Sequence, residues 1–289
     1  MWTPEDECFK MLFTGHPDVY GAENGACVKR PPTQEIFESH LHGPTPIGIY
    51  CMMPGNIVQW ACTDIDIDDY PMASNLASAL RHMGFNPFIE TSRSKGYHVW
   101  VFFKEEVPAR AARHMMLVAH QAANVPIREI NPKQYELTEK KPYGNYVRLP
   151  YPHVLEGSPQ RKVQRAPFKP MLYSDFVWTA YDSGASRTQA EGWARHWVEP
   201  VAAIPIVAKP VGTTAGMSPL TKHVYRNGPG EGWDRSTTLV RLVRLMHEDG
   251  IPASDAKGFL IEADARWGKF SGRADCDERL EETLRTSYV

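Results

Sequence analysis

The sequence lacks the cysteine patterns that stabilise secreted domains or bind zinc. Its five cysteines are odd in number, are scattered along 289 residues and include no CxxC pair, which argues against a disulfide framework or a zinc knuckle. There is also no apolar run of the roughly 18 residues that a membrane span needs. The N-terminal segment MWTPEDECFK is acidic, whereas a signal peptide is basic and then apolar. We therefore expect a cytoplasmic protein with reduced thiols and no membrane partner.

Neither sign of charge is in excess. Lys and Arg number 32 against 34 Asp and Glu, a formal net charge of −2, so nucleic acid would have to be bound in a local basic groove. The chain has neither the GxxxxGK[ST] P-loop of helicases nor a Ser/His/Asp or Cys/His pattern typical of hydrolases. Its 42% hydrophobic residues are typical of globular proteins, and its length suits one large or two modest domains.

The stretch from about Asn56 to Arg148 has the most regular pattern. Its expected order is strand, helix, strand, strand, helix, strand, which is that of a ferredoxin-like or RRM-like (βαββαβ) sheet. This order makes the first and third strands central neighbours and puts the fourth beside the first. The fold class is therefore predicted to be α+β. The expected elements are strand 57–67, helix 71–84, strands 86–91 and 97–103, helix 109–124 and strand 125–130.

The pattern changes after this region. Residues 208–222 (AKPVGTTAGMSPLTK) have the composition of a linker, and the spacing of apolar residues beyond them is helical. Ser236, Ser254 and Asp277 are candidate N-caps for these helices. We predict a first domain over 1–205, a linker over 206–222 and a small helical domain over 223–289.

An acidic cluster ends the first expected strand. Alternation along the strand places Asp64, Asp66 and Asp68 on one face, and the expected strand order brings this face close to His98 and Glu129. Carboxylates in this arrangement suit Mg²⁺ or Mn²⁺ bound between protein oxygens and substrate phosphates. The same short pattern also occurs on solvated strand edges and turns.

A polar turn follows the second expected strand. Ser92, Ser94, Lys95 and Gly96 supply hydroxyls, backbone N–H groups and a cation that could surround a triphosphate. His98 begins the next strand. In later segments Glu129 could supply a further carboxylate, and a strand carrying Arg148 could contact phosphate or base.

These segments together resemble the archaeo-eukaryotic primase superfamily, the primase-polymerases. The resemblance rests on the Asp64 and Asp66 strand, on SRSKGYHVWVFF (92–103) and on GNYVRLP (144–150). The turn is similar to the TSGGKGLH-type turn of polymerase domains attached to bacterial repair ligases. The lead-in HLHGPTPIGIY (40–50) is closer to phage, plasmid and conflict-system primases. The similarity covers about 37–150.

The resemblance implies a set of functional residues. Asp64, Asp66 and Glu129 would be the catalytic ligands of two Mg²⁺ or Mn²⁺ ions, although relatives often have Asp at the third position, which leaves Glu90 and Asp68 as rivals. Other residues would bind the nucleotide or the template. The triphosphate would contact Ser92, Ser94, Lys95 and His98; nucleotide or template would contact Lys133 and Arg148; and nucleic acid would contact Arg93, Tyr97 and Arg161, with Trp100 and Tyr151 as further stacking candidates.

The implied function is primer synthesis on single-stranded DNA from NTPs or dNTPs. Because no helicase motif is present, a separate replicative helicase would unwind the DNA. The resemblance also implies a phage or plasmid source. The helical domain could bind the initiating nucleotide. One alternative is a gap-filling polymerase of the same superfamily that only extends primers. Another is a noncatalytic nucleic-acid-binding module of a replication initiator.

Overall fold

The computed structural model divides the chain into two compact units, Met1–Val198 and Glu199–Val289, which are described separately. It describes residues 2–93, 95–127, 129–166, 169–198, 213–230, 233–273 and 275–288. Residues 206–212 of the predicted linker lie outside these ranges. Met217 is buried in the core of the helical unit, so that unit begins before the predicted residue 223.

The centre of the first unit is an antiparallel sheet with strand order β5-β6-β4-β7. β4 (Ile57–Ile65) pairs with both β6 (Tyr97–Pro108) and β7 (Glu129–Asn131), and β5 (Phe88–Thr91) pairs with β6. This is the predicted ferredoxin-like order. The α+β fold class is therefore confirmed.

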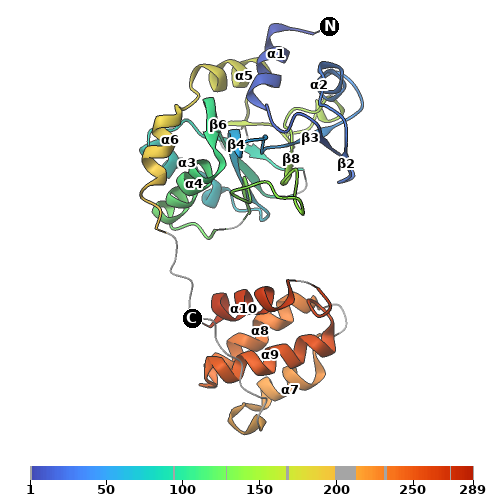
Figure 1. The fold of residues 1–289 in the computed structure, drawn as a ribbon, viewed down its shortest axis with the longest axis vertical. Helices are drawn as coiled ribbons and strands as arrows, with labels where there is room; N and C mark the ends of the chain where they lie inside the picture. Colours follow the sequence, from blue (N-terminus) through green and yellow to red (C-terminus); the bar gives the residue numbers. More distant parts are fainter. Residues whose placement is uncertain are drawn as a thin grey trace. The chain divides into compact units, whose positions relative to one another are not determined.

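Helices α3 (Tyr70–His82) and α4 (Ala109–Ala123) cover one face of this sheet, and they lie side by side next to β4 and β6 in Figure 1. The Asp69 side chain caps α3 by accepting a hydrogen bond from Met72 N–H. Gly84 follows the helix at φ +86°, a backbone conformation that glycine commonly provides where a helix ends. On the covered face, Thr63 hydrogen-bonds His120 of α4. Asp64, the next residue along β4, points to the opposite face.

Some expected bounds differ from the structure. The strand predicted over 125–130 begins only at Glu129, because Val125 N–H bonds to His120 O at the end of α4 and Pro126 has no N–H to donate. The first strand ends at Ile65 rather than at 67, so Asp66 lies just beyond it. β6 continues past Phe103 to Pro108, where Val107 still pairs with Val58.

A second antiparallel sheet, with order β2-β1-β3-β8, carries the late GNYVRLP motif. Its strands are β1 (Tyr20–Ala22), β2 (Cys27–Val28), β3 (Ile47–Tyr50) and β8 (Tyr146–Arg148). β8 pairs with β3, which precedes the ferredoxin-like core in the sequence. The position of the motif therefore depends on residues outside that core.

An aromatic core joins the central sheet to the helices on its second face. Phe13, which follows α1 (Pro4–Leu12), makes edge-to-face contacts with Trp100 and Phe102, and Phe176 of α5 (Tyr173–Asp182) packs against Phe102. Such buried aromatic contacts add to the stabilisation from area burial. The remaining elements of this unit are α2 (Gln34–Leu41), η1 (His153–Leu155), β9 (Gln164–Ala166), β10 (Lys169–Pro170) and α6 (Arg187–Ala194).

The second unit is helical and has its own hydrophobic core, which includes Leu239, Leu242 and Leu284. Asp234 caps α8 by accepting from Thr237 N–H, so the predicted cap Ser236 lies inside the helix. α9 and α10 likewise begin before the predicted caps Ser254 and Asp277. The elements are η2 (Thr214–Gly216), α7 (Pro219–Asn227), α8 (Arg235–Glu248), α9 (Ala253–Trp267) and α10 (Cys276–Ser287).

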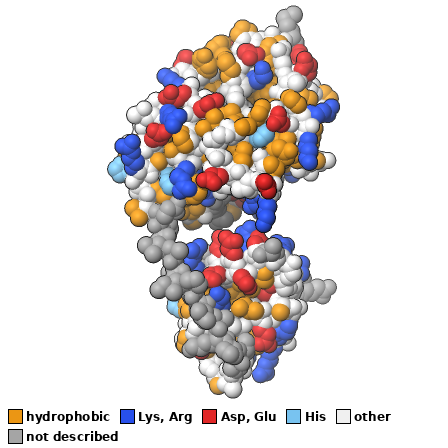
Figure 2. All heavy atoms as spheres, in the orientation of Figure 1, with side chains coloured by type: hydrophobic (Ala, Val, Ile, Leu, Met, Phe, Trp, Pro, Cys, Tyr) orange, Lys and Arg blue, Asp and Glu red, His pale blue; other side chains and the backbone are white. Residues whose placement is uncertain are grey.

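Charged side chains of both signs are interspersed on the surface seen in Figure 2. This distribution agrees with the small net charge of −2 and requires any nucleic-acid contact to be local. Among the helices that the structure describes, none combines the length and apolarity needed to cross a bilayer.

His40 of α2 links the second sheet to the end of the GNYVRLP motif. Its Nε2 donates to Pro150 O at 2.8 Å and its Nδ1 accepts from Ile47 N–H at 3.2 Å, an arrangement that only the neutral ring provides. Burial, with the charge of Arg161 as a second cause, lowers the pKa of His40 to about 3. The ring therefore stays neutral in the folded protein at any pH above about 3.

Acid should destabilise the first unit through His40. Below pH ~6.5, the unfolded chain binds a proton at this residue that the folded chain does not, so stability falls as pH decreases. From the pKa of about 3, we expect a loss of about 2 kcal/mol between pH 7 and pH 5. Urea unfolding followed by tryptophan fluorescence would measure this loss. In His40→Gln, which can keep both hydrogen bonds, the pH dependence should be smaller by that amount. Equal slopes in the two proteins would contradict the assignment.

Candidate active site

β4, β6 and β7 bring three of the predicted site residues together. Asp64 of β4 is paired directly with His98 of β6 on one side and with Glu129 of β7 on the other. Opposed residues in antiparallel strands project from the same face, so the His98 imidazole, the Asp64 carboxylate and the Glu129 carboxylate lie side by side in this order. Asp66 follows the end of β4 and lines the same cleft. The expected convergence of these residues is confirmed, whereas their roles stay predictions.

The cleft has a volume of about 410 Å³ and is walled by both sheets. The acidic residues lie on the central sheet, and the GNYVRLP strand β8 contributes a basic and aromatic wall. The lining residues are Asp64, Asp66, Ser92, Arg93, His98, Glu129, Asn131, Asn145, Tyr146, Val147, Arg148 and Arg161.

The acidic wall fits a hard divalent cation completed by substrate oxygens. Over the described ranges, no three His, Cys, Asp or Glu side chains form a ready metal site, and Glu129 is ion-paired with Lys133. Mg²⁺ is commonly bound by one or two carboxylates together with substrate phosphates. Asn131 adds a buried amide oxygen to the cleft, and this oxygen has no hydrogen-bond partner in the described part of the chain. The all-oxygen donors of Asp64, Asp66 and Asn131 thus suit Mg²⁺ or Mn²⁺.

His98 is held between two carboxylates. Its Nδ1 donates to Glu90 Oε2 at 2.9 Å, and its Nε2 lies 3.7 Å from Asp64 Oδ1. Burial alone would lower the pKa of His98, but the charges and hydrogen bonds of Glu90 and Asp64 raise it to about 10. The imidazole is therefore positively charged at neutral pH and can attract an anion into the cleft.

The polar turn is tied to the end of β4 through Gly96. Gly96 has φ +91°, and a Cβ there would lie 1.9 Å from Ile65 O. Ser92 N–H bonds to Gly96 O at 3.0 Å, and the Ser92 hydroxyl donates to Lys95 O at 2.6 Å. The turn is thus held beside Asp66. Ser92 lines the cleft, Lys95 is exposed and not part of its lining, and Ser94 lies outside the described residues.

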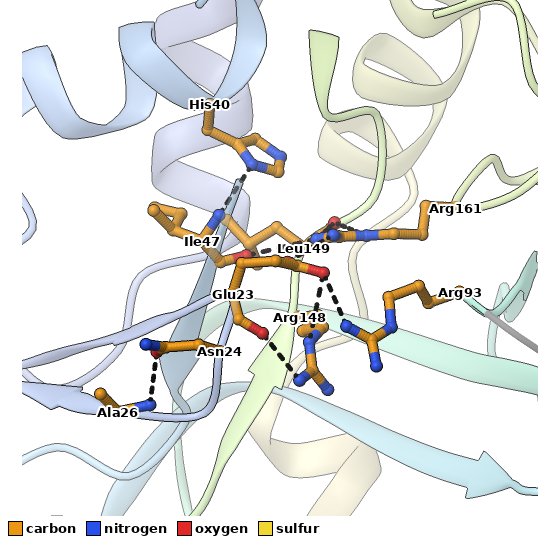
Figure 3. Close-up of polar contacts among 9 residues, drawn as sticks. All are labelled: Glu23, Asn24, Ala26, His40, Ile47, Arg93, Arg148, Leu149 and Arg161. Carbon is orange, nitrogen blue, oxygen red and sulfur yellow. Dashed lines mark hydrogen bonds and ion pairs between the residues drawn. The ribbon is translucent and has the colours of Figure 1, made fainter. Parts of the chain in front are cut away.

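Three arginines converge on Glu23 at the basic wall (Figure 3). Glu23 lies between β1 and β2; its carboxylate accepts from Arg93 Nη1 at 3.1 Å and from Arg161 Nη1 at 2.9 Å, and its backbone carbonyl accepts from Arg148 Nη2 at 3.0 Å. Arg148 Nε lies 3.7 Å from the same carboxylate and has no hydrogen bond within the described ranges. One carboxylate against three guanidinium groups leaves an excess of positive charge, which suits a phosphate. Sequence analysis missed Glu23, since no local pattern marks it.

Several predicted contacts to nucleic acid do not fit the structure. Arg161 borders the cleft but is only 1% exposed and donates to Leu149 O and Ile47 O, so its guanidinium group is not open to nucleic acid. Tyr97 is 4% exposed and donates to Asp68 Oδ1, and Trp100 is fully buried. These three predictions were wrong because the side chains complete the interior of the fold.

The remaining predicted residues differ in whether their side chains lie at the cleft. Tyr151 is half-buried, its ring packs against Tyr173 and Phe176, and it is not part of the cleft lining. Arg93 and Arg148 do reach the cleft. Lys133 is not part of the lining, but it forms an ion pair with Glu129, which is. Of the rivals for a third metal ligand, Glu90 is buried and Asp68 is bonded to Tyr97.

Residues 26–157 match the family model described as "TOTE conflict system, Archaeo-Eukaryotic Primase domain". This range contains β2, the whole ferredoxin-like sheet and β8. It therefore includes both walls of the cleft, except for Glu23 and Arg161. A comparison with curated proteins gave no match.

Gly96→Ala should uncouple the turn from β4. Because the new Cβ would overlap a backbone oxygen at a positive φ, we expect a loss of about 2 kcal/mol or more in unfolding free energy, or a displaced turn. Urea unfolding measures the first effect, and protease sensitivity at Lys95 measures the second. The control is Gly157→Ala, where a Cβ meets nothing within 4 Å. Equal behaviour of the two variants would contradict the close approach.

Proposed function

Because residues 26–157 belong to the archaeo-eukaryotic primase superfamily, we propose that this protein is a primase-polymerase that synthesises primers on single-stranded DNA from NTPs or dNTPs. Family membership supports nucleotidyl transfer of the primase kind. The observation that carries the proposal is the register of β4, which places Asp64 between His98 and Glu129 in a cleft whose other wall holds Arg93 and Arg148.

The two walls suit opposite parts of one reaction. Nucleotidyl transfer forms a bond between a 3′-oxygen and the α-phosphorus and breaks the bond to pyrophosphate, while the hydroxyl proton leaves to solvent. Bound Mg²⁺ or Mn²⁺ would lower the pKa of the hydroxyl and neutralise charge on the phosphates. Asp64 and Asp66 would hold the cations, with Asn131 as a further oxygen donor and Glu129 as a third carboxylate once Lys133 releases it.

The basic groups would orient the triphosphate. The positively charged His98 faces the acidic wall, and Arg93 and Arg148 approach from the other side. Charge-assisted hydrogen bonds from these groups to phosphate oxygens would align the α-phosphate with the attacking hydroxyl. An acidic face that meets a polyanionic substrate is difficult to explain without cations between them. This argument favours an enzyme over a noncatalytic DNA-binding module.

Removal of the two aspartates should abolish synthesis. We expect Asp64→Ala/Asp66→Ala to lower primer synthesis by about a thousandfold or more, since loss of cation binding costs several kcal/mol in the transition state. The assay uses single-stranded DNA, labelled NTPs or dNTPs, and Mg²⁺ or Mn²⁺, without a primer. Asp68→Asn is the matched control, because its oxygen can still accept from Tyr97 and it should retain activity.

The outcomes separate the alternatives. If the intact protein only extends a supplied primer, it is a gap-filling polymerase. If it binds single-stranded DNA but makes no product under either condition, it is a noncatalytic module. Equal synthesis by the intact protein and by the double variant would place the metal ligands elsewhere.

The helical unit should matter for initiation more than for extension. Since the two units have separate cores, a chain ending at Val198 should keep the cleft and extend a primed template at a rate within about twofold of the full chain. Initiation without a primer should fall at least about tenfold, because the grip on the first nucleotide would be lost. Initiation at an unchanged rate would show that the first unit starts synthesis alone.

A further inference from the structure

Glu90 is a buried carboxylate next to the cleft, without being part of its lining. It lies in β5, directly opposite His98 of β6, and its side chain is 0% exposed. Its Oε2 accepts from His98 Nδ1 at 2.9 Å and from Trp100 Nε1 at 2.6 Å. Its Oε1 is also buried and has no hydrogen-bond partner among the described residues. Burial of a carboxylate to this degree costs folding free energy. The Trp100 N–H alone does not require a carboxylate, because a neutral oxygen would accept its hydrogen bond equally well.

The bond to Glu90 determines how the His98 ring is presented. Because Nδ1 is directed at Glu90, Nε2 is the nitrogen that faces the cleft, where it lies 3.7 Å from Asp64 Oδ1. Trp100 packs edge-to-face against the imidazole, with the ring centroids 5.5 Å apart. The ring is thus constrained by a hydrogen bond at one edge and by an aromatic side chain at its side. Carboxylate bonds of this kind fix the orientation of functional histidines in many sites.

We propose that Glu90 is a positioning residue for nucleotide binding, which holds His98 with Nε2 directed at the triphosphate. Glu90 itself touches no substrate. This inference rests on the proposed function, because it takes a nucleoside triphosphate as the ligand of the cleft. It also replaces the earlier alternative in which Glu90 binds a metal, since both of its oxygens are buried behind His98.

A double-mutant cycle tests the link between the two residues. Binding of GTP and dGTP with Mg²⁺ is measured by calorimetry on the full chain in the presence of oligo(dC). We expect Glu90→Gln to weaken binding roughly tenfold, as does His98→Gln, on the scale of one charged hydrogen bond. The double variant should bind no more weakly than His98→Gln alone, because Glu90 acts only through His98.

The matched control is Trp100→Phe, which removes the other donor to Glu90 but keeps an aromatic ring beside His98. Its nucleotide affinity should stay within about twofold of the intact protein, even if its stability falls. Urea unfolding of all variants identifies any that do not fold. If the losses from Glu90→Gln and His98→Gln multiply in the double variant, or if Trp100→Phe weakens binding as much as Glu90→Gln, Glu90 is only structural and the proposal is overturned.

A second measurement does not depend on catalysis or on nucleotide. In protein labelled with ¹⁵N-histidine, the Nδ1 proton of His98 should give a hydrogen-bonded imidazole resonance that is absent in His98→Gln and shifted or lost in Glu90→Gln. An unchanged resonance in Glu90→Gln overturns the positioning role. A different result would contradict the proposed function: the intact protein would bind GTP or dGTP but make no product on primed or unprimed DNA.

Discussion

The antiparallel pairing of β4 with β6 on one side and β7 on the other is the constraint on which the cleft depends. A shift of one residue in either pairing would turn a side chain of the site to the opposite face, where α3 and α4 cover the sheet. Thr63 and His120 bond on that covered face, and the aromatic contacts of Trp100 anchor the other. Burial on both faces therefore fixes the register that places Asp64 between His98 and Glu129.

The polar turn depends on this register as well. Gly96 approaches Ile65 O so closely that only hydrogen fits at its α-carbon, which brings the turn next to the last residue of β4. On the other side, segment 161–163 pairs with β5, with Arg161 N–H bonded to Thr91 O at 2.7 Å and Glu90 bridged to Val163. This segment covers the edge of the sheet and carries Arg161 to Glu23. The acidic and basic walls are consequently parts of one packed structure.

The ferredoxin-like core could be predicted from sequence because its periodicity is local and its strand order follows from a known connection pattern. The clustering of Asp64, His98 and Glu129 followed from that order alone. The basic wall could not be predicted in this way. Glu23 meets Arg148 across 125 positions of sequence, and nothing in the short β1–β2 turn indicates a contact of that range. Sequence also does not show which of two arginines will be buried. The Arg93 side chain is open to the cleft, whereas the Arg161 side chain donates to main-chain oxygens inside the fold.

The charges of the cleft indicate what would complete it. The acidic wall gathers carboxylates that repel one another and repel a phosphate, while, among the described residues, the guanidinium groups of the basic wall share Glu23 as their one carboxylate partner. A cation alone would relieve the first imbalance and leave the second, and a phosphate alone would do the reverse. A nucleoside triphosphate that carries its divalent cations relieves both at once, since the cations meet Asp64 and Asp66 while phosphate oxygens meet Arg93 and Arg148. Electrostatic complementarity therefore favours a metal-bound nucleotide over free phosphate as the ligand of this cleft.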